Sequence, residues 1–263
     1  MEYVSSRDGT GIAFERSGAG PALVVVNGAL SVGTPGNPLG PLLDPHFTLV
    51  RYDRRGRGAS ADAPEYAPER EIEDLEAVVA AVAHAGEAGP FVFGHSSGAR
   101  LSLNAAMRGL PIERLAVNEP PYILEGTRPY PRAMMPRELR ALLAAGDREG
   151  ALQHFLLDQV GLPGFAVDQM RASPFWPQML AIAHTTAYDS ELTIDNEMPV
   201  EALARLEIPV LVTRGGASFP WIGESARVLA ETLPNAEFVV LEGQLHSPTP
   251  QALAPELIRF FLG

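Results

Sequence analysis

Gly-His-Ser-Ser-Gly at residues 94–98 connects a predicted strand to a predicted helix. The short apolar segment 90–93 precedes it, and apolar residues recur at helical spacing over 99–107 after it. A strand, the pattern G-x-S-x-G and a helix in this order predict a sharp turn that lifts the Ser96 hydroxyl clear of a sheet. The first N–H groups of the helix would point at the same spot, where they can stabilise negative charge. An ordinary helix cap also uses Ser and Gly, so the rest of the chain decides between the two interpretations.

Composition excludes several classes of protein. The 263 residues are 46% hydrophobic, which suits one compact domain rather than a disordered chain. No apolar run reaches the length of a membrane span, and the N-terminus lacks the basic start and apolar core of a secretion signal, so we expect a cytoplasmic protein with no membrane partner. The net charge of −12 disfavours binding to nucleic acid. There is no Cys and every basic residue is Arg, which excludes thiol catalysis, Cys-ligated metals and lysine Schiff bases.

Strands and helices alternate along most of the chain. Predicted strands cover 2–6, 11–16, 22–26, 47–52, 90–93, 115–118, 208–213 and 237–241. Predicted helices begin near Glu69 and after the turn at 94–98, and cover 222–232 and 250–262. The run 22–26 is apolar throughout, as expected for a strand buried on both faces. This alternation predicts an α/β fold with a doubly wound, mostly parallel sheet.

Residues 121–204 interrupt the alternation. They contain helical pieces at 137–145, 148–159 and 176–188 and no convincing strand. We therefore predict a core formed by residues 1–120 and 205–263, with a helical lid over 121–204 that we call the insertion. Ligands of open α/β sheets bind beyond the carboxyl ends of the strands. The residues expected at that edge are Asn27, Asp53, Ser96, Glu119, Ser218 and His246.

Residues 56–61 match the dinucleotide-binding pattern G-x-G-x-x-A directly after a strand. Such a site needs a helix to begin there, whereas prolines follow at positions 64 and 68. We therefore interpret the segment as a glycine turn and predict no cofactor and no metal. The neighbouring Arg54, Arg55 and Arg57 are expected to serve turn structure and ion pairs.

Four segments together resemble the α/β-hydrolase fold family over the whole chain. They are Asn27-Gly28, residues 53–60, the turn at 94–98, and Leu245-His246. Only the turn is specific by itself, but the order and spacing of all four segments argue against a chance match. The resemblance implies a serine hydrolase with Ser96 as nucleophile and His246 as general base.

The resemblance also implies an oxyanion hole made by backbone N–H groups. These would come from Ser97 and from the Gly28-Ala29 segment, with Ala29 as the expected donor. The family usually has His where this chain has Asn27. Because the backbone makes the oxyanion hole, this difference changes little.

The acid of the triad is the more telling departure from the family pattern. Ser218 stands where the family usually carries an Asp, and a serine cannot stabilise an imidazolium as a carboxylate does. Some family members, including certain lactonases, take the acid from the end of the strand that follows the nucleophile turn, where this chain has Glu119. We predict Glu119 as the acid, although a Glu beside proline is also typical of a solvated loop. Asp189 is the weaker candidate and is expected to cap or brace the lid.

Aromatic and methionine side chains of the insertion are expected to pack mostly against the core, and a subset would line an apolar substrate pocket. The predicted pocket residues are Leu30, Tyr122, Met134, Trp176, His184 and Tyr188. The insertion has no basic cluster that would indicate a carboxylate-rich substrate, so we expect a small apolar ester-like substrate. His95 is expected to pack away from the Ser96 hydroxyl. No oligomeric state is predicted.

These residues favour cofactor-independent hydrolysis of an apolar carboxylic ester or lactone through an acyl-enzyme. Hydrolysis of a C–C bond and acyl transfer to another acceptor are alternatives for the same triad. The serine at position 218 also leaves open a different class, a ligand-binding protein or biosynthetic cyclase that keeps the pocket without hydrolysis.

Overall fold

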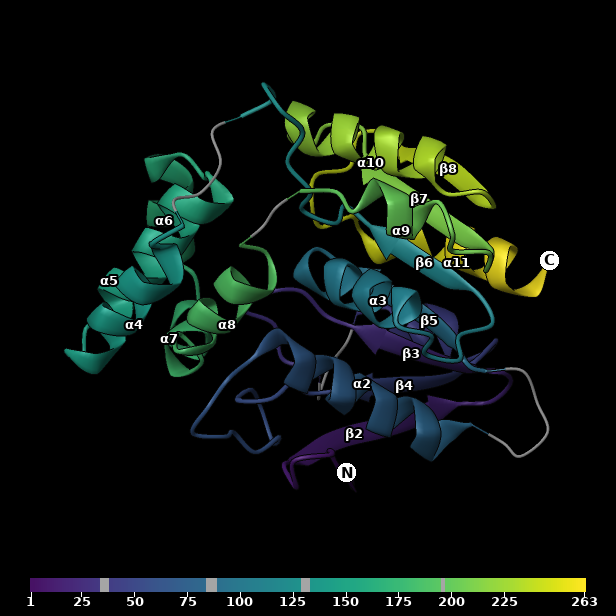
Figure 1. The fold of residues 1–263 in the computed structure, drawn as a ribbon, viewed down its shortest axis with the longest axis horizontal. Helices are drawn as coiled ribbons and strands as arrows, with labels where there is room; N and C mark the ends of the chain where they lie inside the picture. Colours follow the sequence, from purple (N-terminus) through teal and green to yellow (C-terminus); the bar gives the residue numbers. More distant parts are fainter. Residues whose placement is uncertain (34–37, 84–88, 129–132, 195–196) are drawn as a thin grey trace.

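An eight-stranded sheet forms the centre of the computed structural model, which describes residues 1–33, 38–83, 89–128, 133–194 and 197–263 (Figure 1). The strands are β1 (Glu2–Ser5), β2 (Gly11–Gly18), β3 (Ala22–Val26), β4 (Thr48–Tyr52), β5 (Phe91–His95), β6 (Leu115–Asn118), β7 (Val210–Gly215) and β8 (Ala236–Leu241). Their order is β1-β2-β4-β3-β5-β6-β7-β8. β1 pairs antiparallel with β2, and β2 pairs antiparallel with β4, whereas all neighbouring strands from β4 to β8 pair parallel, which confirms the predicted fold class.

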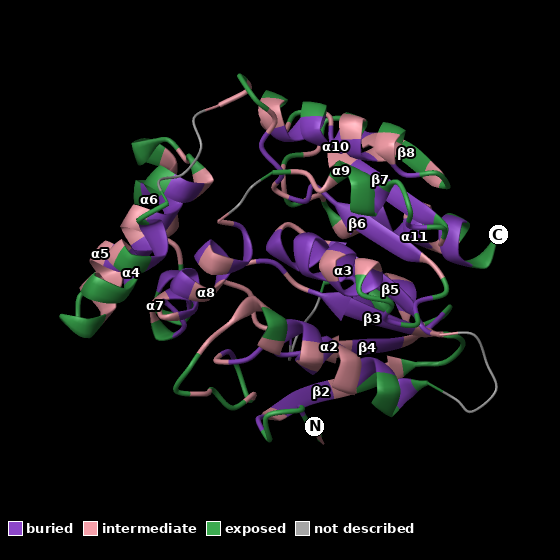
Figure 2. Cartoon of the chain, viewed as in Figure 1, coloured by how far each residue is buried: buried purple, intermediate pink, exposed green. Residues whose placement is uncertain are grey.

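Helices cover both faces of this sheet (Figures 1 and 2). They are α1 (Gly40–Leu43), α2 (Pro68–Val82), α3 (Ser97–Met107), α10 (Pro220–Thr232) and α11 (Pro250–Leu262). Apolar side chains of α2, α3 and α10 pack with Val24 and Val26 of β3, whereas those of α1 and α11 pack with Leu23 and Val25. Because successive side chains of a strand point to opposite faces, the continuous apolar run of β3 serves two cores at once.

Most helices of the insertion form a group beyond the carboxyl ends of the strands (Figure 1). The insertion contains α4 (Met135–Ala144), α5 (Arg148–His154), the π-helical turn η1 (Phe155–Val160), α6 (Gly164–Arg171), α7 (Trp176–Ala181), α8 (Thr185–Leu192) and α9 (Val200–Leu203). Side chains of α4, α5, η1, α6, α7 and α8 share one apolar cluster that is separate from the two sheet cores. By contrast, Leu203 of α9 is buried in the core on the α2/α3 face of the sheet.

The helix predicted over 176–188 is two helices, which corrects the sequence-based boundary. The helix is interrupted between α7 and α8, where the hydroxyls of Thr185 and Thr186 donate to the carbonyl oxygens of Ile182 and Ala183 at 2.8 and 2.7 Å. Such local side-chain bonds compete with regular helical bonding. The sequence pattern alone did not reveal this interruption.

Candidate active site

Ser96 lies in a strained turn between β5 and α3, with a φ of 54°. The turn needs glycine on both sides. A Cβ atom at Gly94 would lie 2.7 Å from the Ser102 Oγ, and one at Gly98 would lie 2.2 Å from the Val26 carbonyl oxygen. Non-glycine residues with positive φ are uncommon and cluster at functional sites. The G-x-S-x-G pattern is therefore a steric requirement of this turn.

Three side chains from three separate loops form one hydrogen-bonded chain. The His246 Nε2 lies 3.0 Å from the Ser96 Oγ, and the His246 Nδ1 lies 2.5 Å from the Glu119 Oε2. The Glu119 side chain is fully buried, whereas that of His246 is 28% exposed. The structure thus brings together the three residues that the sequence analysis assigned to a triad. This order of nucleophile, base and carboxylate can carry out nucleophilic catalysis.

Glu119 has donors for both carboxylate oxygens. The Gly215 N–H donates to Oε1 at 2.8 Å, and the Ser218 hydroxyl donates to Oε2 at 2.8 Å. A buried carboxylate is costly unless its oxygens are hydrogen-bonded, and these two donors together with His246 satisfy that requirement. Ser218 therefore contacts the carboxylate that the sequence analysis predicted as the acid.

Asn118 holds the backbone behind this chain of side chains. Its Nδ2 donates to the His246 carbonyl oxygen at 3.1 Å and to the His95 Nδ1 at 3.0 Å, and its Oδ1 accepts from Thr213 at 2.9 Å. Desolvation and the neighbouring His246 lower the pKa of His95 to about 3. His95 is therefore neutral. Its ring packs 4.9 Å from the His246 ring, and its hydrogen bond is to Asn118 rather than to Ser96.

A cavity of about 80 Å³ lies beside Ser96 and His246. Ala29 and Ser97 form part of its wall, next to Ser96. A Cβ atom at Gly28 would lie 3.0 Å from the Ser96 Cβ, so glycine lets the 28–29 backbone approach Ser96 closely. The apolar wall consists of Ile123, Phe155, Val160, Phe219, Trp221 and Ile222. The space is far smaller than a typical site for a drug-sized ligand.

The structure places the six predicted pocket residues outside the lining of this cavity. Tyr122 is fully buried, with the Arg100 guanidinium carbon 4.3 Å from its ring centre. Trp176 is buried in the apolar cluster of the insertion, and Leu30 packs against that cluster from outside. Met134 is 47% exposed, just before α4. Apolar composition identified packing positions here rather than the cavity wall.

His184 and Tyr188 contact a loop of the core instead of the cavity. The Tyr188 ring stacks on Tyr66 at 4.1 Å, and its hydroxyl donates to the Asp62 carboxylate at 3.0 Å. The His184 Nε2 lies 3.4 Å from the same carboxylate. Both side chains therefore help to join α8 to the core loop that contains Asp62.

The wall contains residues that the sequence analysis missed. Phe219 and Trp221 follow β7 directly, and two aromatic residues at the carboxyl end of a strand were a signal that could have found them. Arg128 lies over the Trp221 ring at 4.7 Å and donates to the carbonyl oxygens of Val160 and Gln159 at 3.1 and 3.2 Å. Burial lowers the pKa of Arg128 from its usual value. A guanidinium in this wall was not expected from the sequence.

Asp189 joins the insertion to the core through buried ion pairs. Arg54 donates to its Oδ1 at 2.9 Å and Arg57 to its Oδ2 at 2.6 Å. Arg54 also makes two bonds to Glu71, at 2.6 and 2.8 Å. All four side chains are at most 1% exposed. Burial alone would raise the pKa of Asp189, but attraction to Arg57 and Arg54 and the bond from Ser97 outweigh it and lower that pKa.

This arrangement gives Asp189 a bracing position, as predicted, and its partners are arginines rather than His246. The third arginine, Arg55, pairs with Asp74 at 2.7 Å on the neighbouring surface of α2. The ion-pair interpretation of the three arginines is therefore confirmed.

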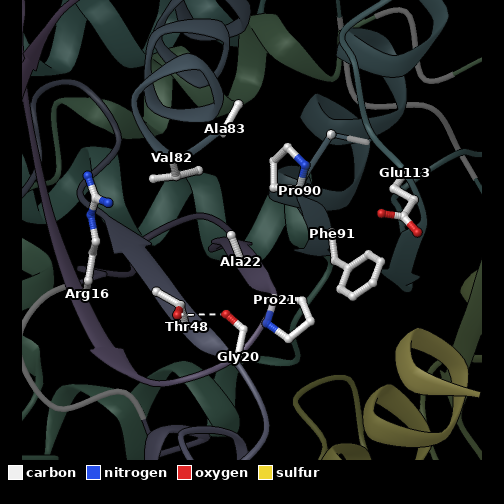
Figure 3. Close-up of a pocket in the computed structure, with 11 residues that line it drawn as sticks. Arg16, Gly20, Pro21, Ala22, Thr48, Val82, Ala83, Pro90, Phe91 and Glu113 are labelled. Atoms are coloured by element: carbon white, nitrogen blue, oxygen red, sulfur yellow. Dashed lines mark hydrogen bonds between the residues drawn. The ribbon is translucent and has the colours of Figure 1, made fainter. Parts of the chain in front are cut away.

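A second, larger hollow of about 610 Å³ lies at the opposite end of the sheet (Figure 3). Ala22, Thr48 and Phe91, the first residues of β3, β4 and β5, line it. The Thr48 hydroxyl donates to the Gly20 carbonyl oxygen at 2.8 Å across its floor. The strands that begin here end at the Ser96 edge, so this hollow is separated from the candidate site by the length of the sheet.

Among the residues that the structure describes, no group of three or more His, Asp or Glu side chains is arranged to hold a metal ion. Within the same residues, no helix is long and apolar enough to cross a membrane.

Known proteins resemble this chain over different shares of its length. The structure of an alpha/beta hydrolase from Sphaerobacter thermophilus is 52% identical, with a TM-score of 0.93 over 99% of this chain and 100% of that one. A non-heme chloroperoxidase of Streptomyces lividans is 27% identical over 99% of both chains. An N-formylmaleamate deformylase of Pseudomonas putida is 34% identical, but over 43% of this chain and 42% of that protein. These likenesses support hydrolase activity in general. The model of the alpha/beta hydrolase family matches residues 23–256, and the chain therefore belongs to that family.

Proposed function

We propose that this protein is a serine hydrolase that cleaves a small, largely apolar carboxylic ester or lactone through an acyl-enzyme. The observation that carries the proposal is the continuous chain of hydrogen bonds from Ser96 through His246 to Glu119 beside a mostly apolar cavity. The proposal needs both features. The pocket alone would only bind a ligand, and the hydrogen-bonded side chains alone would have no substrate beside them.

The geometry suits a two-step acyl transfer. The Ser96 Oγ would attack the carbonyl carbon while the His246 Nε2 takes its proton, and the backbone N–H groups of Ala29 and Ser97 would stabilise the oxyanion. Collapse of the tetrahedral intermediate breaks the C–O bond, and His246 returns the proton to the leaving alkoxide. Water then attacks the acyl-enzyme with His246 again as base. Glu119 would stabilise the imidazolium in both steps.

Small size and an apolar wall support an ester or lactone with short substituents. The name of the Pseudomonas relative, N-formylmaleamate deformylase, indicates that this relative removes a formyl group from nitrogen. Amides matched to each ester are therefore the second substrate series to test, with the same nucleophile and base.

Labelling with a fluorophosphonate probe tests the proposal directly, because only an activated serine should react at a useful rate. We expect one label on Ser96 in the wild-type protein and none in Ser96→Ala. Ser247→Ala, which removes an exposed serine next to His246, is the matched control and should label normally. Ester hydrolysis should be lost in parallel. Normal turnover of 4-nitrophenyl acetate by Ser96→Ala would refute the assignment of the nucleophile.

A further inference from the structure

The buried ion pairs between the core and the insertion reach Ser97. The Ser97 hydroxyl donates to the Asp189 Oδ1 at 2.7 Å and accepts from the Arg54 Nη1 at 3.1 Å. Ser97 is the first residue of α3, and its side chain is buried. The same residue would supply a backbone N–H to the oxyanion. Its side chain therefore fixes the position of a main-chain group beside the nucleophile.

Arg54 also contacts the other half of the proposed oxyanion hole. Its Nη1 lies 3.3 Å from the Asn27 carbonyl oxygen, two residues before Ala29. Two bonds to Glu71 hold the guanidinium in place. A planar guanidinium with several fixed donors can keep such groups in register, and burial among carboxylates keeps it charged. One nitrogen thus contacts both parts of the proposed oxyanion hole, the 27–29 segment through the Asn27 carbonyl oxygen and Ser97 through its hydroxyl.

The direction of the Ser97 hydroxyl argues against simple helix capping. Ser102, in the same helix, donates its hydroxyl to the Gly98 carbonyl oxygen at 2.8 Å, which is the ordinary local bond of a helical serine. Ser97 instead bonds to a residue 92 positions later in the chain, on α8. Asp189 already has two arginine partners, so bracing of the insertion does not by itself require the serine.

We infer that Arg54 and Asp189 are positioning residues that hold Ser97 and the 27–29 segment at the spacing that binds an oxyanion. Stabilisation of an oxyanion depends on donors placed within a few tenths of an ångström, so loss of this support should weaken binding of the transition state more than binding of the substrate. The inference rests on the proposed serine-hydrolase function. It also explains why α8 contributes a charged residue to the cavity wall.

Ser97→Ala is the first test, because it removes both side-chain bonds and leaves the backbone N–H and the arginine–carboxylate pairs in place. We expect kcat/KM for 4-nitrophenyl acetate to fall about tenfold, less than the loss from deleting a whole oxyanion donor. The Ki of methylboronic acid, whose tetrahedral adduct carries an oxygen into the hole, should rise by the same factor. The Ki of 4-nitrophenyl ethyl ether, which has no carbonyl oxygen, should not change.

Asp189→Asn is the second variant and should show the same pattern of the three constants. Asp62→Asn is the matched control, because Asp62 also accepts bonds from α8, through Tyr188, but does not contact Ser97. It should leave all three constants unchanged. An unchanged boronate Ki in Ser97→Ala, or equal changes in the boronate and ether Ki values, would overturn the inference. An inactive, unlabelled wild-type protein would instead refute the proposed function.

Discussion

Two buried carboxylates lie on opposite sides of the Ser96 turn, and their partners differ in kind. Glu119 accepts from a backbone N–H, a hydroxyl and the His246 ring. Asp189 accepts from two arginines and the Ser97 hydroxyl. Permanent positive charges already balance Asp189, whereas the partners of Glu119 carry no fixed charge. Of the two, Glu119 is therefore the carboxylate that could stabilise a positive charge developing on the His246 ring in the proposed reaction. The comparison teaches that the charge of the partners, rather than burial, distinguishes a carboxylate available to a titrating side chain from one already paired in an ion pair.

Glu119→Gln should produce the largest effect. The change keeps the shape but removes the charge that stabilises protonated His246, and loss of the comparable group in a protease triad lowers kcat by about 10⁴. Steady-state hydrolysis of 4-nitrophenyl acetate measures it. Glu125→Gln, an exposed glutamate six residues further on, is the control and should be unaffected. A Glu119→Gln enzyme with near wild-type kcat would remove Glu119 from the triad.

Asp189→Asn should mainly affect stability. Removal of Asp189 leaves Glu71 as the carboxylate facing Arg54 and Arg57, so one buried positive charge is uncompensated, which costs roughly 3 kcal/mol of unfolding free energy. Chemical denaturation measures this loss, and Asp62→Asn, with a partly exposed carboxylate, should cost less than about 1 kcal/mol. The rate should fall only about tenfold through Ser97. If Asp189→Asn lost more rate than Glu119→Gln, the roles of the two carboxylates would have to be exchanged.

The stability difference between wild type and Asp189→Asn should depend on pH in one direction. Arg57 and Arg54 hold the pKa of Asp189 below its usual 3.8. The stabilisation is therefore complete above the unfolded-state pKa and disappears as pH falls through the lower folded-state value. Unfolding midpoints at pH 7, 5, 4 and 3 should show a constant gap down to about pH 5 and a smaller gap below pH 4. A gap that widens on acidification would contradict the ion-pair assignment.

Ser218→Ala should have the smallest effect. The hydroxyl donates to Glu119 but carries no charge, so kcat should fall by less than about tenfold. The double variant Ser218→Asp with Glu119→Gln should recover part of the rate lost by Glu119→Gln alone. The reason is that an aspartate at position 218 would lie next to the place of the lost Glu119 carboxylate. A collapse of activity in Ser218→Ala would mean that this hydroxyl does more than support Glu119.

The sequence was sufficient for the sheet because short apolar runs of strand length are local signals, and β3 shows this at Leu23 to Val26. The positions of Ser96 and His246 follow from the strand ends for the same reason. The cavity wall was not predictable in this way. Which face of α8 meets the core depends on the break at Thr185 and on ion pairs across more than 130 positions of sequence. Tertiary packing, rather than local pattern, decides such contacts.

The left-handed backbone at the site has a consequence for engineering. Among the described residues, the non-glycine positions with positive φ are Leu30, Ser96 and Glu119, at 57°, 54° and 48°. Each costs the folded state on the order of 1 kcal/mol relative to an unstrained residue. Glycine would relieve the strain at all three, but at two of them it would delete a side chain proposed to do the chemistry. Leu30 is thus the position where substitution by glycine can relieve backbone strain without removing a side chain proposed to react. At Ser96 and Glu119 the strain is a stability cost that accompanies the proposed function.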